Sequence, residues 1–219
     1  MKHDLVINGG TLASSSETFK ADIGIKNGTI VTLGEDLKGE DVIDASGKLV
    51  LPGGIETHCH IAQESAMSIM TADDYETGSI SAAFGGNSCF VPFAAQRKGQ
   101  SLRDTLNVYD ARAKTKSVID YSYHLILTDV NKKVLKDLPE VFDFGITSFK
   151  VFMTYATRIN DSQFLDILTI AREHGGLTMV HAENHDMLTW MAKRLTDSGY
   201  LDPKYHAPSR PALAEEEAI

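Results

Sequence analysis

The sequence contains few cysteines and no long apolar segment. Its 219 residues include two cysteines, Cys59 and Cys89, which are too few for a disulfide framework and favour the reducing cytoplasm. No run approaches the roughly 18 apolar residues that a membrane-spanning helix requires. The first residues, Met-Lys-His-Asp, lack the apolar core of a signal peptide. We therefore expect a cytoplasmic protein with no membrane partner.

The sequence also lacks a block of basic residues. It has 21 lysines and arginines against 30 aspartates and glutamates, a formal net charge of −9. A protein that follows nucleic-acid phosphates needs clustered positive charge, so we expect no nucleic-acid partner. Hydrophobic residues make up 42% and charged residues 23%, which is typical of a globular protein rather than a disordered one.

The pattern of residues 1–50 predicts a small β unit. Short apolar runs alternate with turn signals, and two of these turns contain Asn-Gly, at Asn8-Gly9 and Asn27-Gly28. Asn-Gly between alternating runs favours a β-hairpin, so we expect an antiparallel arrangement. The strands are too few and too short for an independent core. We therefore assign residues 1–50 to the amino-terminal part of a small β-sandwich domain.

Residues 51–219 show a different rhythm, in which apolar strands alternate with helices. The expected strands are Leu49–Gly54, Asn87–Phe93, Tyr121–Leu127, Thr147–Met153 and Leu177–His181, and the expected helices are Thr71–Phe84, Gln100–Thr115, Val130–Glu140, Asp161–His174 and Asp186–Ser198. Continuous apolar strands joined by helices predict a parallel sheet. Five β/α units in series resemble the start of a (β/α)8 TIM-like barrel more than a doubly wound sheet, although periodicity alone fits both.

The end of the sequence also shapes the expected fold. Ser209 is a suitable N-cap, and residues 212–219 form helix-favouring sequence without a C-terminal stop signal. We therefore expect residues 51–219 to be the first part of a truncated barrel.

The strongest chemical motif is His58-Cys59-His60, which follows Pro52-Gly53-Gly54. Two histidines at i and i+2 of an extended chain point to the same side, about 6–7 Å apart at Cα. That spacing suits two imidazoles on one divalent metal ion, while Cys59 points the other way. The alternative is a polar loop that happens to contain two histidines.

Lys150 lies within the apolar strand Ser148–Met153. Desolvation disfavours a buried ammonium group, and two outcomes are open. The side chain can extend to water near the strand end. Alternatively its pKa falls, the neutral amine reacts with carbon dioxide, and the carbamate becomes an anionic ligand that bridges two metal ions.

His181 ends another apolar strand, where a lone histidine is more often a satisfied core residue than a ligand. The argument for a site is the combination, because His58, His60, Lys150 and His181 all fall near predicted carboxyl ends of strands. In a parallel barrel these ends share the face where active sites are built. His124, in the middle of a strand, is expected to be structural.

Several segments together resemble the dihydropyrimidinase/hydantoinase family, cyclic-amide hydrolases of the amidohydrolase superfamily. In chain order these segments are Pro52–His60, Thr71–Tyr75, Ala83–Asn87, Ser148–Tyr155, Val180–Asn184 and Ala207–Pro211. The similarity covers nearly the whole chain in the family's order, and it corresponds to the amino-terminal part of such an enzyme.

The resemblance implies a metal-dependent mechanism. It implies that His58 and His60 bind one metal ion, that carboxylated Lys150 bridges it to a second, and that His181 binds the second. Tyr155 would donate a hydrogen bond to the oxyanion. The ions would be two zincs, with manganese as an alternative, and a metal-bridging hydroxide would open a hydantoin or dihydropyrimidine ring.

The resemblance also implies a tetramer or dimer. The family's remaining metal ligands, a histidine and an aspartate, would lie beyond Ile219. We therefore expect the isolated 219-residue chain to be inactive.

Two other functions remain open. An allantoinase- or dihydroorotase-type enzyme shares the chemistry, but dihydroorotate carries a carboxylate and calls for a basic neighbour. The loop after His60 offers Gln63 and Glu64 instead. A non-catalytic scaffold protein on the same fold is the other alternative, and such a protein has no reason to keep the four ligand-type residues together.

Overall fold

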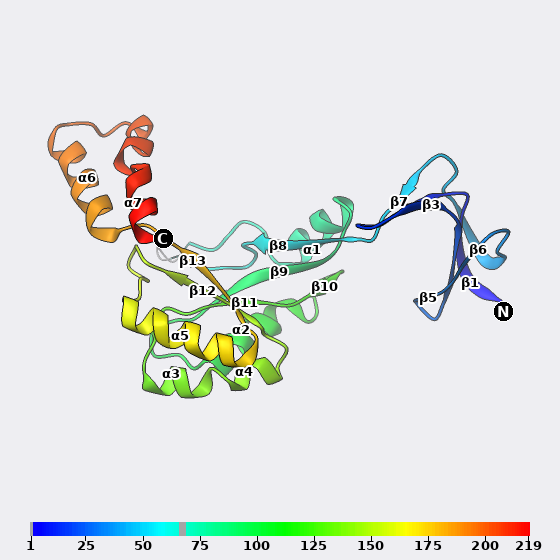
Figure 1. Ribbon diagram of the computed structural model, residues 1–219, viewed down its shortest axis with the longest axis horizontal. Helices are drawn as coiled ribbons and strands as arrows, with labels where there is room; N and C mark the ends of the chain where they lie inside the picture. The colour runs from blue at the N-terminus through cyan, green and yellow to red at the C-terminus, as the bar shows by residue number, and fades with distance from the viewer. Residues whose placement is uncertain (1, 66–68) are drawn as a thin grey trace. The chain divides into compact units, whose positions relative to one another are not determined.

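The computed structural model describes residues 2–65 and 69–219 and divides into two compact units (Figure 1). Unit 1 is Met1–Gly54 and unit 2 is Ile55–Ile219. Each unit is described by itself below. Among the described residues, no helix combines the length and apolar character needed to cross a membrane.

Unit 1 consists of two small sheets. Its strands are β1 (His3–Asn8), β2 (Thr11–Ala13), β3 (Thr18–Lys20), β4 (Asp22–Lys26), β5 (Thr29–Gly34), β6 (Gly39–Asp44) and β7 (Leu49–Val50). One sheet has the order β5-β4-β1-β6 and the other has the order β3-β2-β7.

The hairpin prediction is right at one Asn-Gly pair and wrong at the other. β4 and β5 pair antiparallel across Asn27 and Gly28, which have φ values of 50° and 71°, as a type I′ turn requires. At Asn8-Gly9 the chain instead passes from one sheet to the other, so β1 and β2 do not pair. The expectation of a wholly antiparallel unit is also wrong, because β1 pairs parallel with β6 and β2 pairs parallel with β7.

Unit 2 alternates strands and helices. Its strands are β8 (Gly54–Cys59), β9 (Asn87–Ala95), β10 (Asp120–Tyr121), β11 (His124–Ile126), β12 (Ser148–Phe152) and β13 (Leu177–His181). Its helices are α1 (Tyr75–Phe84), α2 (Leu102–Ala113), α3 (Lys132–Asp137), α4 (Glu140–Asp143), α5 (Asp161–His174), α6 (His185–Asp197) and α7 (Ala212–Ala218), with 3-10 turns η1 (Pro203–Tyr205) and η2 (Ala207–Ser209) before α7.

The sheet of unit 2 is parallel, as its sequence pattern predicts. The strand order is β10-β9-β11-β12-β13, and β8 also pairs with β9. The registers of β9, β10, β11, β12 and β13 are all parallel, so their carboxyl ends lie at one edge. Helices α2 to α5 lie along one face of this sheet (Figure 1).

The helix-facing side of the sheet carries the main core. Phe90, Leu125, Phe149 and Val151 are fully buried there among the helix side chains. Burying apolar surface of this kind is the dominant stabilising contribution to folding. The core therefore fixes the orientation of each strand, and the alternate residues of the strand must face the other way.

Proline and capping residues explain where the observed elements depart from the expected ones. Pro139 lacks an N–H and separates α3 from α4, where a single helix is expected. Pro52 lies between β7 and β8, so the expected strand Leu49–Gly54 is two pieces and the His-x-His motif lies at the end of β8. The helix at Asp161–His174 has the expected bounds, with Asn160 as the N-cap and Gly175 at φ 71° as the C-cap.

Two further expectations are corrected. The expected strand Tyr121–Leu127 is divided into β10 and β11, which both pair with β9. Ser209 does not cap the last helix, because Pro211 occupies the N-cap position without a side-chain hydrogen bond. Ser209 instead ends the 3-10 turn η2.

Candidate functional site

The strand registers place Lys150 and His181 on the same face of the sheet. Phe149 and Val151 face the helices, so Lys150 and Phe152 point to the opposite face. Phe152 pairs with His181 across β12 and β13, and paired residues of neighbouring strands share a face. The rings of Phe152 and His181 are stacked, with centroids 5.8 Å apart.

His58 and His60 lie together at the carboxyl end of β8. Their ring centroids are 5.7 Å apart, and both rings contact Phe93, at 4.8 Å and 5.0 Å between centroids. Cys59, between them, packs against the helix-facing core. Burial raises the pKa of its thiol to about 11.

His124 is a buried structural residue, and it connects two of the three strands that carry the predicted ligands. Its Nε2 lies 2.8 Å from the carbonyl oxygen of Thr57, and its Nδ1 lies 2.5 Å from Oγ of Ser148. Because a carbonyl oxygen only accepts, Nε2 donates and Nδ1 accepts from the hydroxyl. Burial lowers the pKa of His124, which favours this neutral form. The ring therefore ties β8 to β12.

Lys150 is half-buried, and burial lowers the pKa of its amine. Its Nζ lies 5.4 Å from the centre of the Phe152 ring. Among residues 2–65 and 69–219 no carboxylate forms an ion pair with it. The side chain therefore has an apolar neighbour and a destabilised ammonium form.

Tyr155 and His181 are neighbours. The Tyr155 hydroxyl lies 3.4 Å from Nε2 of His181, and their ring centroids are 5.1 Å apart. Tyr155 has a φ of 69°, in the left-handed region that bulky residues rarely adopt. Such a conformation costs about 1–3 kcal/mol and clusters at functional sites, which makes Tyr155 a candidate functional residue on backbone grounds as well.

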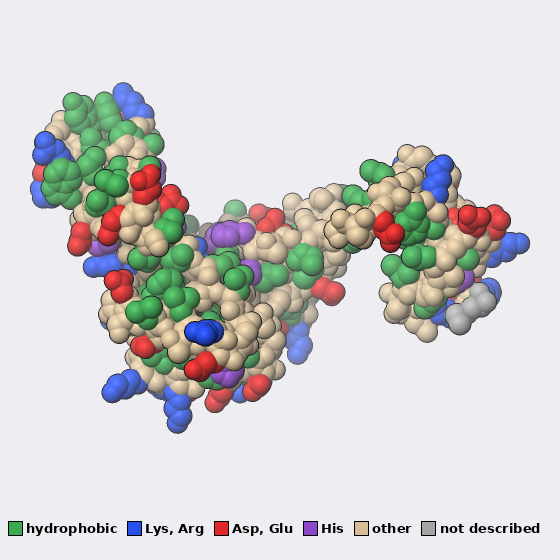
Figure 2. Space-filling view, in the orientation of Figure 1, with side chains coloured by type: hydrophobic (Ala, Val, Ile, Leu, Met, Phe, Trp, Pro, Cys, Tyr) green, Lys and Arg blue, Asp and Glu red, His purple; other side chains and the backbone are tan. Residues whose placement is uncertain are grey.

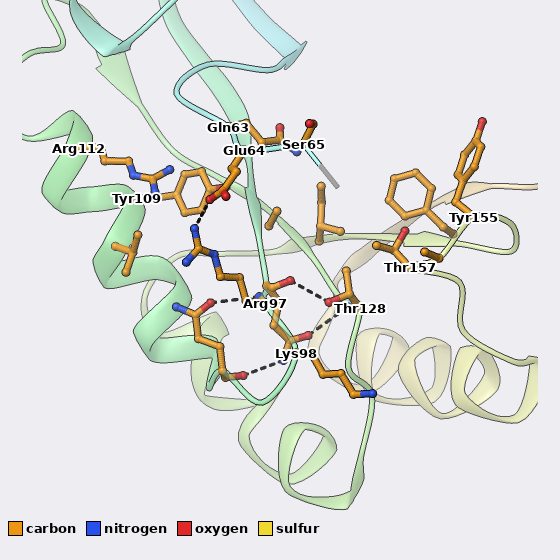
Figure 3. Close-up of a pocket in the computed structure, with 17 residues that line it drawn as sticks. Gln63, Glu64, Ser65, Arg97, Lys98, Tyr109, Arg112, Thr128, Tyr155 and Thr157 are labelled. Atoms are coloured by element: carbon orange, nitrogen blue, oxygen red, sulfur yellow. Dashed lines mark hydrogen bonds and ion pairs between the residues drawn. The ribbon is translucent and has the colours of Figure 1, made fainter. Parts of the chain in front are cut away.

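A cavity of about 540 Å³ lies at the carboxyl ends of the strands (Figure 3). Its floor includes Ala95, Ile126 and Phe152, which are the last residues of β9, β11 and β12. Tyr155 and the segment 63–65 also line it. In α/β folds with parallel strands, this edge is where ligands bind.

Sequence reasoning missed the basic residues of this cavity. Arg97, Lys98 and Arg112 line it, and Arg97 forms an ion pair with Glu64 across the cavity wall (Figure 3). Arg112 donates to the carbonyl oxygen of Ala62 at 2.6 Å. Arg97 and Lys98 lie just after the carboxyl end of β9, which is the position that could have revealed them. The strand was expected to end at Phe93, which is too early to place these residues at its end.

The four predicted ligands form two groups. His58 and His60 surround Phe93, whereas Lys150 and His181 both lie near Phe152. Figure 2 shows exposed histidine side chains on this unit. Over the described part of the chain, no three histidine, cysteine, aspartate or glutamate side chains converge on one metal position. Convergence of all four ligands therefore stays a prediction.

The donor chemistry nevertheless fits a divalent transition metal. His58 and His60 offer imidazole nitrogens, and within the described ranges no hydrogen bond involves the ring of His58 or Nε2 of His60. Imidazole and carbamate oxygen form a ligand set that zinc accepts. Their side chains are exposed, so an ion has access.

The chain has well-matched relatives of known structure. The D-hydantoinase of Geobacillus stearothermophilus is 39% identical over 218 residues, which are 97% of this chain and 46% of the relative. A solved D-hydantoinase structure is 40% identical with a TM-score of 0.94, and the match covers 98% of this chain and 48% of that one. The dihydropyrimidinase of Brevibacillus agri is 40% identical with a TM-score of 0.92, over 97% and 47% of the two chains.

The chain is thus similar to hydantoinases and to a dihydropyrimidinase. It spans about half the length of the curated hydantoinases it matches, their amino-terminal part. The resemblance inferred from the sequence motifs is thereby confirmed, and so is an α/β fold whose parallel sheet curls like that of the hydantoinase structures. No protein-family model matches the chain.

Proposed function

We propose that this chain forms part of an enzyme that hydrolyses the C–N bond of a cyclic amide or imide, such as a hydantoin or a dihydropyrimidine. The observation that carries the proposal is the placement of Lys150 and His181 on one sheet face, with His58 and His60 paired at the end of β8. Named relatives of this chain are D-hydantoinases. The proposal agrees with both.

The residues that would hold metal ions are assigned as follows in this proposal. His58 and His60 would hold one divalent ion, His181 would hold a second, and carboxylated Lys150 would be a ligand of both. Zinc suits this set best, and manganese is the alternative. When bound, two such cations make a water molecule available as a nucleophile near neutral pH and polarise the amide carbonyl.

The proposed carboxylation of Lys150 follows from its burial. Desolvation lowers the pKa of the amine, so a larger fraction is neutral and nucleophilic at pH 7. The amine nitrogen forms a bond with the carbon of carbon dioxide and releases one proton to water, leaving a carbamate with one negative charge. The reaction converts a cation into an anionic oxygen ligand without any other reactant.

In the proposed reaction, Tyr155 donates its hydroxyl proton in a hydrogen bond to the oxyanion that forms at the attacked carbonyl. The hydroxyl lies beside His181 and at the rim of the cavity. A donor placed where negative charge develops is one of the strongest catalytic devices available. The unusual backbone of Tyr155 at φ 69° holds the ring at this position.

The proposal also concerns the rest of the enzyme. We propose that the sheet is part of a (β/α)8 barrel and that further ligands come from the half-length of the relatives that this chain does not span. Closing a barrel requires strands to pair around the full circle, so ring opening would need that second half. We propose a dimer or tetramer for the complete enzyme.

A second candidate substrate class has one observation in its favour. Arg97, Lys98 and Arg112 line the cavity, and a basic neighbour suits a carboxylated ring of the dihydroorotate type. Arg97, however, is already paired with Glu64. A substrate panel of hydantoins, dihydrouracil, allantoin and dihydroorotate separates these classes.

The deciding experiment measures metal content and ring opening on the complete enzyme, in which this chain is joined by the half that it does not span. The proposal expects two divalent ions per site, hydantoin or dihydrouracil hydrolysis, and a native mass that carries one added carbon dioxide. A protein that binds neither zinc nor manganese and opens none of these rings would refute the proposal and favour a scaffold protein.

A further inference from the structure

Glu183 is a mostly buried carboxylate to which the proposed function assigns no role. Its side chain is 15% exposed. One oxygen, Oε2, lies 2.5 Å from Nε2 of His181 and 2.7 Å from Nη1 of Arg210. The carboxylate thus connects a predicted metal ligand to a basic residue from a later part of the chain.

This contact selects one nitrogen of the His181 ring. An ionised carboxylate only accepts hydrogen bonds, so Nε2 must carry the proton that is shared with Glu183. In a neutral imidazole the other nitrogen, Nδ1, then holds the free electron pair. Across the described ranges, no residue hydrogen bonds with Nδ1 of His181.

We propose that Glu183, held by Arg210, is a positioning residue that fixes the proton of His181 on Nε2 and leaves Nδ1 as the metal ligand. The inference rests on the proposed function, because it assumes that His181 binds metal. Carboxylates that accept from the second nitrogen of a ligand histidine fix its tautomer and orientation and increase its basicity.

Arg210 keeps the carboxylate charged and in place. Nη1 of Arg210 donates to Oε2 of Glu183 at 2.7 Å, and this ion pair favours the ionised carboxylate. The Arg210 guanidinium also lies over the Tyr155 ring, 5.3 Å from its centre. One arginine therefore contacts both Glu183 and Tyr155, the two neighbours of Nε2 of His181.

The segment that carries Arg210 is anchored to the end of β13. The backbone N–H of Asn184 donates to the carbonyl oxygen of Ala214 at 2.8 Å, and the Asn184 side chain donates to Glu217 at 2.5 Å. Both acceptors are on α7, directly after Arg210. The helical segment after α6 thereby becomes part of the support of the metal ligand.

The test compares the zinc affinity of the complete enzyme, which contains this chain and the half that it does not span, with that of four variants, measured by competition with a chromogenic chelator. E183A removes the carboxylate that contacts His181, and R210A removes the guanidinium that holds this carboxylate. E183Q keeps the shape and one acceptor oxygen, and E173A is the matched control, because Glu173 is an exposed carboxylate on α5. Cobalt(II) replaces zinc in a parallel series to report ligand geometry by visible absorption.

We expect E183A to bind one of two zinc ions tenfold to a hundredfold more weakly, as removal of such partners does elsewhere. R210A should lose less zinc affinity than E183A, and E183Q should retain more zinc affinity than E183A. The cobalt spectrum should change in E183A and stay unchanged in E173A. A role in packing alone would lower the melting temperature of E183A but not that of E183Q, and it would leave the cobalt spectrum of both variants unchanged.

The outcomes separate this inference from the proposed function. If the unmodified protein binds zinc and E183A and E183Q bind it with the same affinity and the same cobalt spectrum, the role of Glu183 is refuted and the proposed function stands. If the unmodified protein binds no zinc or cobalt, the proposed function fails and this inference fails with it.

Discussion

The two faces of the parallel sheet in unit 2 differ in composition although they alternate along the same strands. On β12, Phe149 and Val151 are fully buried against the helices. Their neighbours Ser148, Lys150 and Phe152 face the other way and contact His124, His181 and one another. Alternate residues of one strand therefore serve two purposes: one set packs against the helices, and the other set carries the candidate functional residues.

The difference shows that stability and function are separable in this unit. Apolar residues on the helix side contribute through buried area and close packing. On the other side His124 links two strands through hydrogen bonds, whereas Lys150 and His181 are only partly buried. Substitutions on the first face should change the free energy of unfolding, whereas those on the second should change metal binding and turnover.

The largest effect is expected for Lys150 on the chemical face. Under the proposed function K150A removes a carbamate ligand, so the complete enzyme should lose detectable ring opening and part of its bound metal, while its melting temperature changes little. Hydantoin hydrolysis and metal analysis check this result, with K136A on the exposed side of α3 as the control. Unchanged turnover in K150A would show that the lysine has no chemical role.

The next effect is expected for Phe149 on the packing face. F149A should lower the free energy of unfolding by about 3–5 kcal/mol, because it opens a cavity at a fully buried site. Urea denaturation measures this change. F84A is the matched control, since Phe84 is 92% exposed, and its effect should stay within about 0.5 kcal/mol. Equal losses in the two variants would contradict the assignment of the core.

A smaller effect is expected for Tyr155. Y155F removes one donor to the oxyanion and should lower kcat by about 10²–10³-fold with little change in KM. Steady-state kinetics test this, and Y200F provides a control at an exposed tyrosine. If kcat is preserved while KM increases, Tyr155 contributes to substrate binding instead.

The smallest effect is expected at Asp74, the N-cap of α1. Its carboxylate pairs with Lys116 and accepts from the first turn of the helix, and these contacts lower its pKa to about 2. The group is more acidic in the folded state, so its contribution is complete above about pH 4. It is lost as the pH falls from about 4 towards 2.

D74N removes this titration and keeps a capping oxygen. Thermal melts should therefore show a small stability advantage of the unmodified protein at pH 6 that shrinks below pH 4. An advantage that persists at pH 2 would mean that the ionised carboxylate is not its source.

Much of unit 2 was predictable because its local signals agree. The bounds of α5 and β13 follow from Asn160, Gly175 and the apolar periodicity between them. The relationship to hydantoinases was also visible, because motifs such as His58-Cys59-His60 and Ser148–Tyr155 occur in the family's order. In this unit the local sequence preferences agree with the observed fold.

The pairing of unit 1 was less predictable. β1 and β6 are parallel neighbours although the sequence favours hairpins. A hairpin signal describes residues that are close in sequence, whereas strand partners from distant segments depend on how the sheets pack. For the same reason the sequence did not reveal that Arg112 reaches the carbonyl oxygen of Ala62.

The sequence by itself determined the alternation of strands and helices, the family relationship and the identity of the candidate ligands, because these are written in composition, spacing and short motifs. Only the tertiary structure decided how two of the histidines are supported, since His124 bonds to Thr57 and Ser148 on other strands and the local contact of His181 with Glu183 depends on a distant residue. Arg210 completes that support from 27 residues further along the chain. Hydrogen bonds of this kind form only after distant segments have been brought together by the burial of the helix-facing core.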